Sequence, residues 1–443
     1  MRDAQPDQTG PFDRLKAMRG RGERPRLVVV GGGFGGLAVL HGLRGEPADI
    51  TIVDRQNHHL FQPLLYQVAT AALSPADIAA PIRTIVKRHD NVHVIMDEVV
   101  GVDTERRTVA LSSGAELAYD ILVLATGARH SYFGHDDWSA FAPGIKTIDD
   151  ATRVRRSILY AMERAETQRQ EGTARSDDYL TFAVIGGGPT GVEMAGAIAE
   201  LTRHAVAMDF RYITRDCVRI LLIEAGNRLL PAFPDDLSAA AKASLEKLGV
   251  EVRLNGAVTH IDETGVTVGA QHIQAATVIW AAGVQASPAG AWLGAVTDRA
   301  GRMVLEPDLA VPGHPEIFAI GDTVSVKDAR GRAIPGVAPA AKQQGEYVAK
   351  AVAAALRGRR LKRRFRYRDF GALATIGRNR AVIDLGWLHL KGLPAWLIWS
   401  TAHLYFLVGF RNRLLVGVTW LWSYLTFERG ARLITGLGNE RTD

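Results

Sequence analysis

Two glycine-rich turns of the form G-x-G-x-x-G are the segments of this 443-residue chain with the clearest chemistry. They span residues 31–36 and 186–191, and each follows an apolar run typical of a buried strand. The first glycine of such a turn allows a tight bend, the second lets backbone amides approach a pyrophosphate, and the third lets a helix pack closely. The helix N-terminus then favours the anion. Two such turns predict two bound dinucleotides, as electron transfer between two cofactors requires.

An acidic residue follows each turn at the end of a later apolar strand. Asp54 lies 23 residues beyond Gly31, near the spacing expected for a carboxylate that binds an adenosine ribose. Glu224 lies 38 residues beyond Gly186, and the excess falls on a helical extension around residues 201–216. A carboxylate there accepts the ribose 2′-hydroxyl and repels a 2′-phosphate, which favours NADH over NADPH. The alternative for both residues is a solvated acid at a strand end.

Strand-like and helix-like segments alternate around the two turns. We expect helices over residues 149–170 and 237–248, and buried strands over residues 121–127 and 277–283, the last two sharing an Ala-x-Gly ending. This resemblance between distant segments indicates an internal duplication of folding units. Alternation of this kind predicts an α/β fold with doubly wound parallel sheets.

Composition narrows the chemistry. The formal charge of +6 allows an acidic partner, nucleic acid or anionic lipid. The single cysteine, Cys217, excludes an intramolecular disulfide and a redox-active cysteine pair, and we expect it to be a packed small hydrophobe. His58 and His59 have no carboxylate or cysteine at ligand spacing, so we predict structural or phosphate-contacting histidines and no metal site. Residues 1–25 lack the apolar stretch of a signal peptide, which predicts a cytoplasmic protein.

Several motifs together resemble known flavoproteins. The first turn, the Ala-Thr-Gly at 125–127 and the segment Ile-Phe-Ala-Ile-Gly-Asp at 317–322 resemble the FAD-binding set of flavoproteins with two dinucleotide-binding domains. Residues 58–69, 191–193 and 342–345 are similar to segments of type II NADH:quinone oxidoreductases. The resemblance covers roughly residues 26 to 430.

The resemblance implies two Rossmann-like domains of the glutathione-reductase kind, with FAD and NADH as cofactors and a membrane-associating helical segment at the C-terminus. We expect a flexible tail over residues 1–24 and an FAD-binding domain in two parts, residues 25–150 and 301–375. The NADH-binding domain is expected over residues 151–300, and C-terminal helices for membrane anchoring or dimerisation over residues 376–443.

The same resemblance names the cofactor-binding residues. Asp322 is expected to bond the ribityl chain of the flavin, with Gly321 near its pyrophosphate. The predicted FAD-binding residues are Gly31, Gly33, Phe34, Gly35, Gly36, Asp54, Arg55, Thr126, Gly127, Gly321 and Asp322. The predicted NADH-binding residues are Gly186, Gly188, Pro189, Thr190, Gly191, Glu224 and Gly283.

Hydride transfer needs the nicotinamide stacked close to the flavin, so the protein contributes mainly positioning and water exclusion. By resemblance Glu193 influences quinone or nicotinamide exchange; the alternative is a first-turn acid stabilised by the helix dipole. Lys342 is expected to supply positive charge near the reduced flavin, or else to face solvent. Gln343 and Gln344 are expected at the flavin edge. Pro339 departs from the family, because many members carry at this position a glutamine assigned to the quinone side.

The C-terminal part combines a basic run with apolar segments. Residues 357–368 hold eight cations in twelve positions, whereas residues 393–410 and 414–427 contain no charged side chain. Five of the eight tryptophans lie between residues 387 and 422, as in an interfacial belt. We therefore predict two helices in one leaflet, with the basic run attracting anionic headgroups rather than nucleic acid. Core or dimer-interface helices and a spanning hairpin are the alternatives.

Together these features predict a non-electrogenic, FAD-dependent NADH:quinone oxidoreductase that pumps no protons. Its expected partners are quinone, an anionic membrane surface and a second copy in a homodimer, with no nucleic acid, and its expected place is the cytoplasmic face of the cell membrane. A soluble reductase that passes electrons to a protein, or a flavin-binding redox sensor, would be the alternative. A sulfide:quinone oxidoreductase is disfavoured because it needs more than one cysteine.

Overall fold

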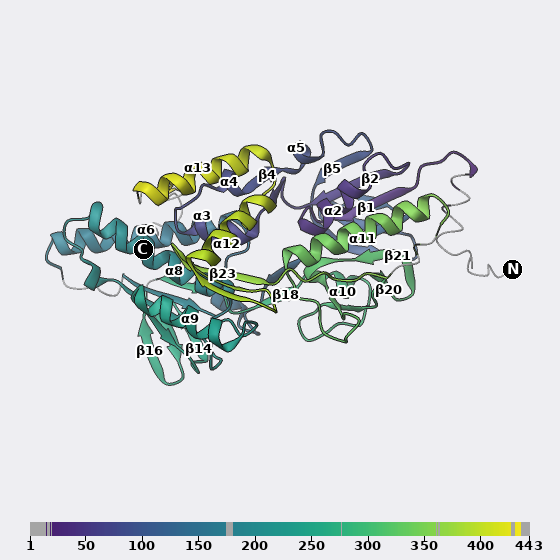
Figure 1. The fold of residues 1–443 in the computed structure, drawn as a ribbon. Coiled ribbons are helices and arrows are strands. Elements are labelled where there is room, and N and C mark those ends of the chain that lie inside the picture. The colour runs from purple at the N-terminus through teal and green to yellow at the C-terminus, as the bar shows by residue number, and fades with distance from the viewer. Residues whose placement is uncertain are drawn as a thin grey trace. The chain divides into compact units, whose positions relative to one another are not determined.

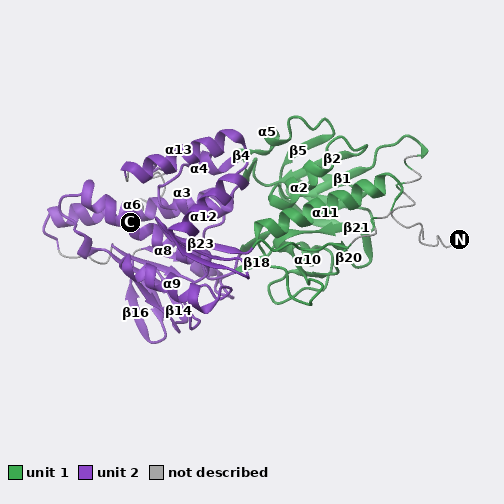
Figure 2. Cartoon of the chain, viewed as in Figure 1, with its two compact units in different colours: residues 1–59, 80–129, 284–370 green, residues 60–79, 130–283, 371–443 purple. Residues whose placement is uncertain are grey.

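The computed structural model describes residues 15, 18, 20–173, 180–275, 277–359, 361, 364–426 and 430–435. Most of the predicted tail over residues 1–24 and part of the basic run over 357–368 lie outside these residues. The chain divides into two compact units (Figure 2). Unit 1 consists of residues 1–59, 80–129 and 284–370, and unit 2 of residues 60–79, 130–283 and 371–443.

Unit 1 is built on a six-stranded sheet in the order β20-β21-β9-β1-β2-β5. All neighbouring strands run parallel except β20 and β21. The central strand β1 is buried after its first residue, which explains its continuous apolar run. The sheet strands are β1 (Arg26–Val30), β2 (Asp49–Asp54), β5 (Val92–Met96), β9 (Ile121–Leu124), β20 (Ala310–Val311) and β21 (His314–Ala319).

Two helices of unit 1, α2 (Phe34–Gly42) and α11 (Ala338–Leu356), pack against each other along their lengths (Figure 1). Glycine permits this approach, because a Cβ on Gly345 would lie 2.3 Å from the Gly35 carbonyl oxygen. The other elements of unit 1 are α5 (Ile82–Val86), β6 (Val99–Asp103), β7 (Thr108–Leu111), β8 (Glu116–Ala118), β18 (Val284–Ala286), α10 (Ala289–Trp292), β19 (Met303–Leu305), η4 (Gly321–Thr323) and β22 (Val324–Val326). Three short strands extend across a unit boundary: β3 (His58–Leu60), β4 (Ala79–Pro81) and β10 (Ala128–His130).

Unit 2 repeats the central part of this sheet. Its four parallel strands lie in the order β13-β12-β11-β17, which matches β5-β2-β1-β9 of unit 1 strand for strand. In both sheets the third strand from one end, β1 or β11, leads into a glycine turn and a helix. The predicted duplication and doubly wound α/β fold are therefore confirmed. The strands are β11 (Thr181–Ile185), β12 (Arg219–Ile223), β13 (Val250–Arg253) and β17 (Thr277–Trp280).

The helices of unit 2 lie close to the expected ranges. The helix expected over 149–170 is α6 (Ile148–Gln170), and the one expected over 237–248 is α9 (Asp235–Lys247). The helix after the second turn, α8 (Pro189–Met208), is 20 residues long, against 9 residues for α2. The remaining elements are η1 (Gln62–Leu64), α3 (Leu65–Ala69), α4 (Pro75–Ile78), η2 (Asp136–Ala140), η3 (Arg215–Cys217), β14 (Val258–Asp262), β15 (Gly265–Val268) and β16 (Gln271–Gln274). Cys217 is buried and free, as expected.

A C-terminal module completes unit 2. It begins with an antiparallel sheet of β23 (Ala372–Gly377), β24 (Arg380–Asp384) and β25 (His389–Gly392), and continues with α12 (Leu393–Phe406) and α13 (Phe410–Thr426). Strand β23 lies directly on α8, where a Cβ on Gly196 would be 2.0 Å from the Ile376 carbonyl oxygen. Only helices were expected in this segment from the sequence, so the sheet of β23, β24 and β25 is a correction. No helix within the described ranges combines the length and apolarity needed to cross a bilayer.

Candidate functional site

The first glycine turn has two positions closed to any side chain and one that is open. Gly31 has a φ of +103°, and a Cβ there would lie 2.3 Å from the Ala125 carbonyl oxygen. A Cβ on Gly36 would lie 1.9 Å from the Gly31 carbonyl oxygen. A Cβ on Gly33, by contrast, would meet no protein atom within 4 Å. The turn therefore fits a ligand that approaches the backbone at the middle glycine, as a dinucleotide pyrophosphate does.

The second turn has the same construction. Gly186 has a φ of +111°, and a Cβ there would lie 2.6 Å from the Ala281 carbonyl oxygen. A Cβ on Gly191 would lie 1.8 Å from the Gly186 carbonyl oxygen, whereas Gly188 again faces open space. The helices that follow, α2 and α8, begin after glycine N-caps that provide no side-chain hydrogen bond. The backbone N–H groups of their first turns therefore remain available to an anion, except at Pro189, which has none.

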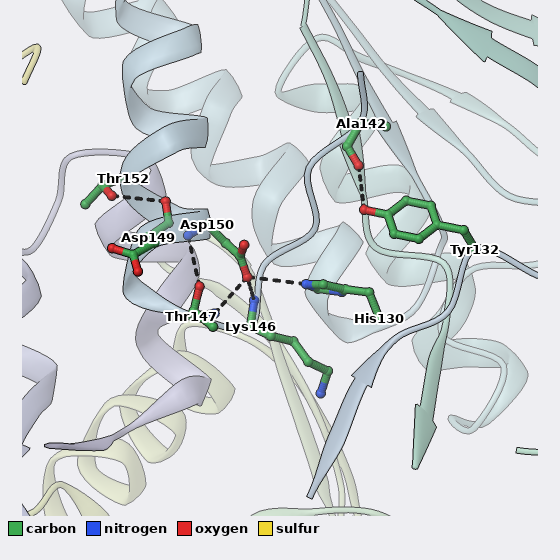
Figure 3. Close-up of polar contacts among 8 residues, drawn as sticks. All are labelled: His130, Tyr132, Ala142, Lys146, Thr147, Asp149, Asp150 and Thr152. Atoms are coloured by element: carbon green, nitrogen blue, oxygen red, sulfur yellow. Dashed lines mark hydrogen bonds and ion pairs between the residues drawn. The ribbon is translucent and has the colours of Figure 1, made fainter. Parts of the chain in front are cut away.

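The N-terminus of helix α6 is capped by side chains of the chain itself (Figure 3). The Thr147 hydroxyl accepts from the Asp150 N–H at 3.1 Å, and the Asp150 carboxylate accepts from the Thr147 and Lys146 N–H groups. Burial opposes ionisation of Asp150, but these bonds and His130, whose Nε2 lies 3.4 Å away, lower the pKa of the carboxyl group. Helices α2 and α8 lack such a cap, and in addition each follows a glycine turn whose middle position is open. This combination supports ligand binding there.

The two strand-end acids occupy equivalent places. Asp54 accepts from the Gly32 N–H at 2.6 Å through one oxygen and from the Gln56 N–H at 2.7 Å through the other. Glu224 likewise accepts from the Gly187 N–H at 2.5 Å and the Gly226 N–H at 2.6 Å. The longer α8 absorbs the extra residues, so Glu224 lies beside its turn despite the long spacing. Ribose binding by either acid stays a prediction, as does any role of Arg55, which is exposed.

His59 contacts the first glycine turn. It is 2% exposed, its Nδ1 lies 2.9 Å from the Gly32 carbonyl oxygen, and its ring meets that of Phe34 edge-on at 5.0 Å. Burial lowers the pKa of this imidazole, so it is neutral at neutral pH. The described residues include no group of three potential metal ligands. The contact with Gly32 is a structural one, as one of the two expected roles of His59 requires, and contact with a phosphate stays a prediction.

Segments far apart in the sequence meet at the carboxyl ends of β9 and β21. The Thr323 hydroxyl accepts from the Gly127 N–H at 3.0 Å and lies 3.2 Å from the Thr126 hydroxyl. A Cβ on Gly336 would lie 3.1 Å from Asp322 Oδ1. The predicted flavin contacts Thr126, Gly127 and Asp322 thus belong to one end of the unit 1 sheet, the edge at which ligands of open α/β sheets bind.

The structure gives Gln343 and Gln344 partners in the protein itself. The Gln343 side chain donates to the Arg368 carbonyl and accepts from the Arg368 N–H, both at 2.9 Å. Gln344 is 3% exposed, and its Oε1 accepts from the Gly321 N–H at 2.6 Å. Lys342 is half exposed, with its Nζ 4.0 Å from Glu346. The predicted contacts of these side chains with the flavin stay predictions.

Glu193, the fifth residue of α8 and just beyond its first turn, is the acid with the most perturbed pKa near either glycine turn. Burial raises the pKa of its carboxyl group to about 8, against the lowering effect of one hydrogen bond from the Thr375 N–H at 3.4 Å. The C-terminal strand β23 supplies this contact, which the sequence could not show. Pro189 and Thr190 are exposed at the start of the same helix, and a Cβ on Gly283 would lie 2.6 Å from the Phe133 ring.

Comparison with known proteins identifies the family. Residues 25–345 match the family model of pyridine nucleotide-disulphide oxidoreductases, and residues 370–429 match that of the NDH2 C-terminal domain. Over 430 residues the chain is 42% identical to the type II NADH:quinone oxidoreductase NdhA of Mycobacterium tuberculosis, covering 94% of this chain and 90% of the relative. The chain belongs to the type II NADH:quinone oxidoreductase family.

Further relatives agree with this assignment. A type II NADH:quinone oxidoreductase of Staphylococcus haemolyticus is 31% identical over 81% of this chain and 89% of the relative. The structure of NDH2 from Plasmodium falciparum in complex with NADH superposes with a TM-score of 0.83 at 20% identity, covering 94% of this chain and all of that one. At that identity the match shows the fold, which is the one expected from the two glycine turns.

Substitution of the open middle glycines, Gly33 and Gly188, should weaken the binding of one cofactor at a time. A Cβ at either position meets no protein atom within 4 Å, and valine accepts the observed φ values of −73° and −72°, so both variants should fold. We expect Gly33→Val to lower the bound FAD on the order of tenfold, because charge-assisted bonds to the pyrophosphate are lost. Gly188→Val should keep its FAD and bind NADH about tenfold more weakly for the same reason.

Flavin absorbance of the purified proteins and NADH titration provide the readouts, with thermal melting as the control for folding. Each variant serves as the control for the other. Loss of NADH binding with full flavin retention in Gly33→Val would show that the two turns had been assigned the wrong way round.

Proposed function

We propose that this chain is an FAD-dependent NADH:quinone oxidoreductase that does not pump protons. The supporting observation is that two equivalent glycine turns, each followed by a helix without a side-chain N-cap, occur in a chain of the type II family. FAD, when bound, supplies the two-electron carrier between NADH and quinone. The residues of the chain hold the two nucleotides, exclude water and manage protons. The soluble reductase and the redox sensor have no such support from the comparisons.

We assign FAD to the turn at residues 31–36 and NADH to the turn at residues 186–191. The first turn shares its sheet edge with Thr126, Gly127 and Asp322, which match the flavin motifs of the family. The second has Glu224 beside it, and a carboxylate at this position disfavours the 2′-phosphate of NADPH. We assign residues 25–150 and 301–375 to FAD binding, residues 151–300 to NADH binding and residues 376–443 to the C-terminal part, as expected from the sequence. The compact units differ from these limits, because residues 60–79 and 130–150 belong to unit 2 and residues 284–300 to unit 1.

We assign Glu193 the role of holding a proton for the reduced quinone. Reduction of a quinone to a hydroquinone consumes two electrons and two protons, and a general acid works best with a pKa near the working pH. The raised pKa of Glu193, about 8, keeps its carboxyl group protonated at neutral pH. An ordinary exposed glutamate would be ionised there and could not donate.

The outer faces of α12 and α13 form the proposed membrane-binding surface. Phe410, Leu421 and Leu425 are 81%, 60% and 67% exposed. A single exposed apolar side chain is ordinary, but a group of them on two successive helices is typical of a surface that binds a membrane or another protein. Two exposed arginines at the start of α13 suit anionic headgroups. Attachment is then peripheral, and the cytoplasmic face is the side on which NADH is available. The apolar surface consists of Leu393, Leu397, Ile398, Tyr405, Phe406, Phe410, Leu414, Leu415, Val418, Leu421, Trp422, Tyr424 and Leu425.

The decisive test of the proposed activity separates its two half-reactions. Under anaerobic conditions NADH should bleach the flavin absorbance of the purified protein, and a short-chain quinone added afterwards should restore it. Bleaching without recovery on quinone, but with recovery on a protein acceptor such as ferredoxin, would favour the soluble reductase. A colourless protein that cannot be reconstituted with FAD would exclude both.

The pH dependence of flavin reoxidation by quinone reports on Glu193. Because the folded pKa lies above the usual glutamate value, the proton is present below pH 8 and is lost above it. The rate should therefore fall as pH rises through about 8, whereas flavin reduction by NADH should change little. Glu193→Gln, which carries no ionisable proton, should lower the rate by on the order of 10²-fold and flatten the profile. Glu163→Gln, at an exposed position of α6, should keep the wild-type profile.

Charge placed on the apolar surface should release the protein from lipid. The double variant Leu421→Glu/Leu425→Glu should lose at least about tenfold in affinity for vesicles containing anionic lipid, because each buried leucine contributes roughly 1.5–3 kcal/mol. Met208→Glu, at the equally exposed end of α8, should bind like the wild type. A double variant that still binds vesicles but changes from dimer to monomer would mark the surface as the homodimer contact instead.

A further inference from the structure

An aromatic cluster lies beneath the apolar surface of α12 and α13. The Trp399 ring stacks on those of His403 and Trp420, with centroids 4.1 Å and 5.6 Å away. Phe61 meets His403 edge-on at 6.1 Å, and Trp420 donates from Nε1 to Gln67 Oε1 at 2.8 Å. All five residues belong to unit 2. Flat, apolar walls with a few fixed polar atoms are typical of a small-molecule site.

The tautomer of His403 follows from its contacts. Its Nδ1 lies 2.8 Å from the Trp399 carbonyl oxygen, one helical turn earlier. Because a carbonyl oxygen can only accept, Nδ1 carries the hydrogen. Burial lowers the pKa of this imidazole to about 4, so the ring is neutral at neutral pH. Nε2 is therefore a bare acceptor, on a ring that is only partly exposed.

Trp399 presents the complementary group. The residue is 2% exposed, and its Nε1–H is a buried donor without a partner in the described part of the chain. The neighbouring Trp420 shows that such a donor is normally satisfied, since its own Nε1–H bonds Gln67. Buried donors of this kind are rare and indicate a missing ligand or water.

A single hydroxyl group can serve both atoms, because it accepts from the Trp399 N–H and donates to the bare nitrogen of His403. A carbonyl oxygen satisfies only Trp399. We propose that Trp399 and His403 bind a hydroxyl group of the hydroquinone product, and thereby prefer the reduced carrier over the oxidised one. This inference rests on the proposed quinone reductase activity. The apolar residues of α12 and α13 on the outer side suit the lipophilic body of such a molecule.

Product inhibition provides the test. Initial rates with NADH and a short-chain quinone are measured with increasing amounts of the matching short-chain hydroquinone. In His403→Phe, which has no acceptor, the inhibition constant for hydroquinone should rise five- to tenfold while the KM for quinone stays within twofold, because only the hydroxyl used the nitrogen. His403→Gln, whose side-chain oxygen accepts, should recover most of the inhibition. His260→Phe, in the exposed part of β14, should behave as the wild type.

Trp399→Phe keeps an aromatic ring and loses only the Nε1–H donor, so it covers the case in which His403→Phe does not fold. It should raise the KM for quinone and the hydroquinone inhibition constant by similar factors, because both ligands use that donor. Flavin content and flavin reduction by NADH should be unchanged in every variant. An unaltered inhibition constant in both His403→Phe and Trp399→Phe would mean that the cluster holds only water. If the wild type fails to reduce quinone at all, the proposed activity fails rather than this inference.

Discussion

The chain depends on backbone amides that no side chain of its own satisfies. At the starts of α2 and α8 the N-cap is a glycine, and no side chain closes the first turn. The opposite solution is present in α6, where Thr147 and Asp150 satisfy each other's backbone groups. An uncapped helix end costs stability in the free protein, and a bound pyrophosphate recovers it. With the proposed assignment of FAD and NADH to the two turns, cofactor binding is coupled to folding at the two places where the duplicated units are most alike.

The steric limits on these turns explain why their sequences are so similar. Four glycines would each bring a Cβ within 2.6 Å of a carbonyl oxygen, namely Gly31, Gly36, Gly186 and Gly191. The two middle glycines have no such limit, so the protein backbone alone does not require them. Their presence is a signature of the ligand rather than of the fold. A turn built only for packing would tolerate a side chain at the middle position.

Much of the fold could be predicted from the sequence, because it follows from residue patterns over short stretches of chain. The turns, the strand pairs around them and helices α6 and α9 follow from short-range patterns, and the structure has them within a few residues of the expected limits. The missed sheet β23–β25 also had a local signal, because Asn379, with a φ of +62°, connects two apolar runs. The contact between Glu193 and Thr375 had none, since it joins residues 182 positions apart. The backbone partners of Gln343 and Gln344 were hidden for the same reason.

Two titratable side chains of unit 2, Glu193 in α8 and His403 in α12, are both uncharged at neutral pH. The N-terminus of α8 can bind an anion, whereas toward the C-terminal module burial favours the uncharged form of the titratable groups. The pKa of Glu193 is raised to about 8 and that of His403 is lowered to about 4, so both side chains are uncharged at neutral pH. A charged group would need water or a counter-ion in the same space, and either would exclude a lipophilic carrier. Neutral polar groups can still donate or accept a hydrogen bond, which is what the oxygens of a quinone and its hydroquinone require.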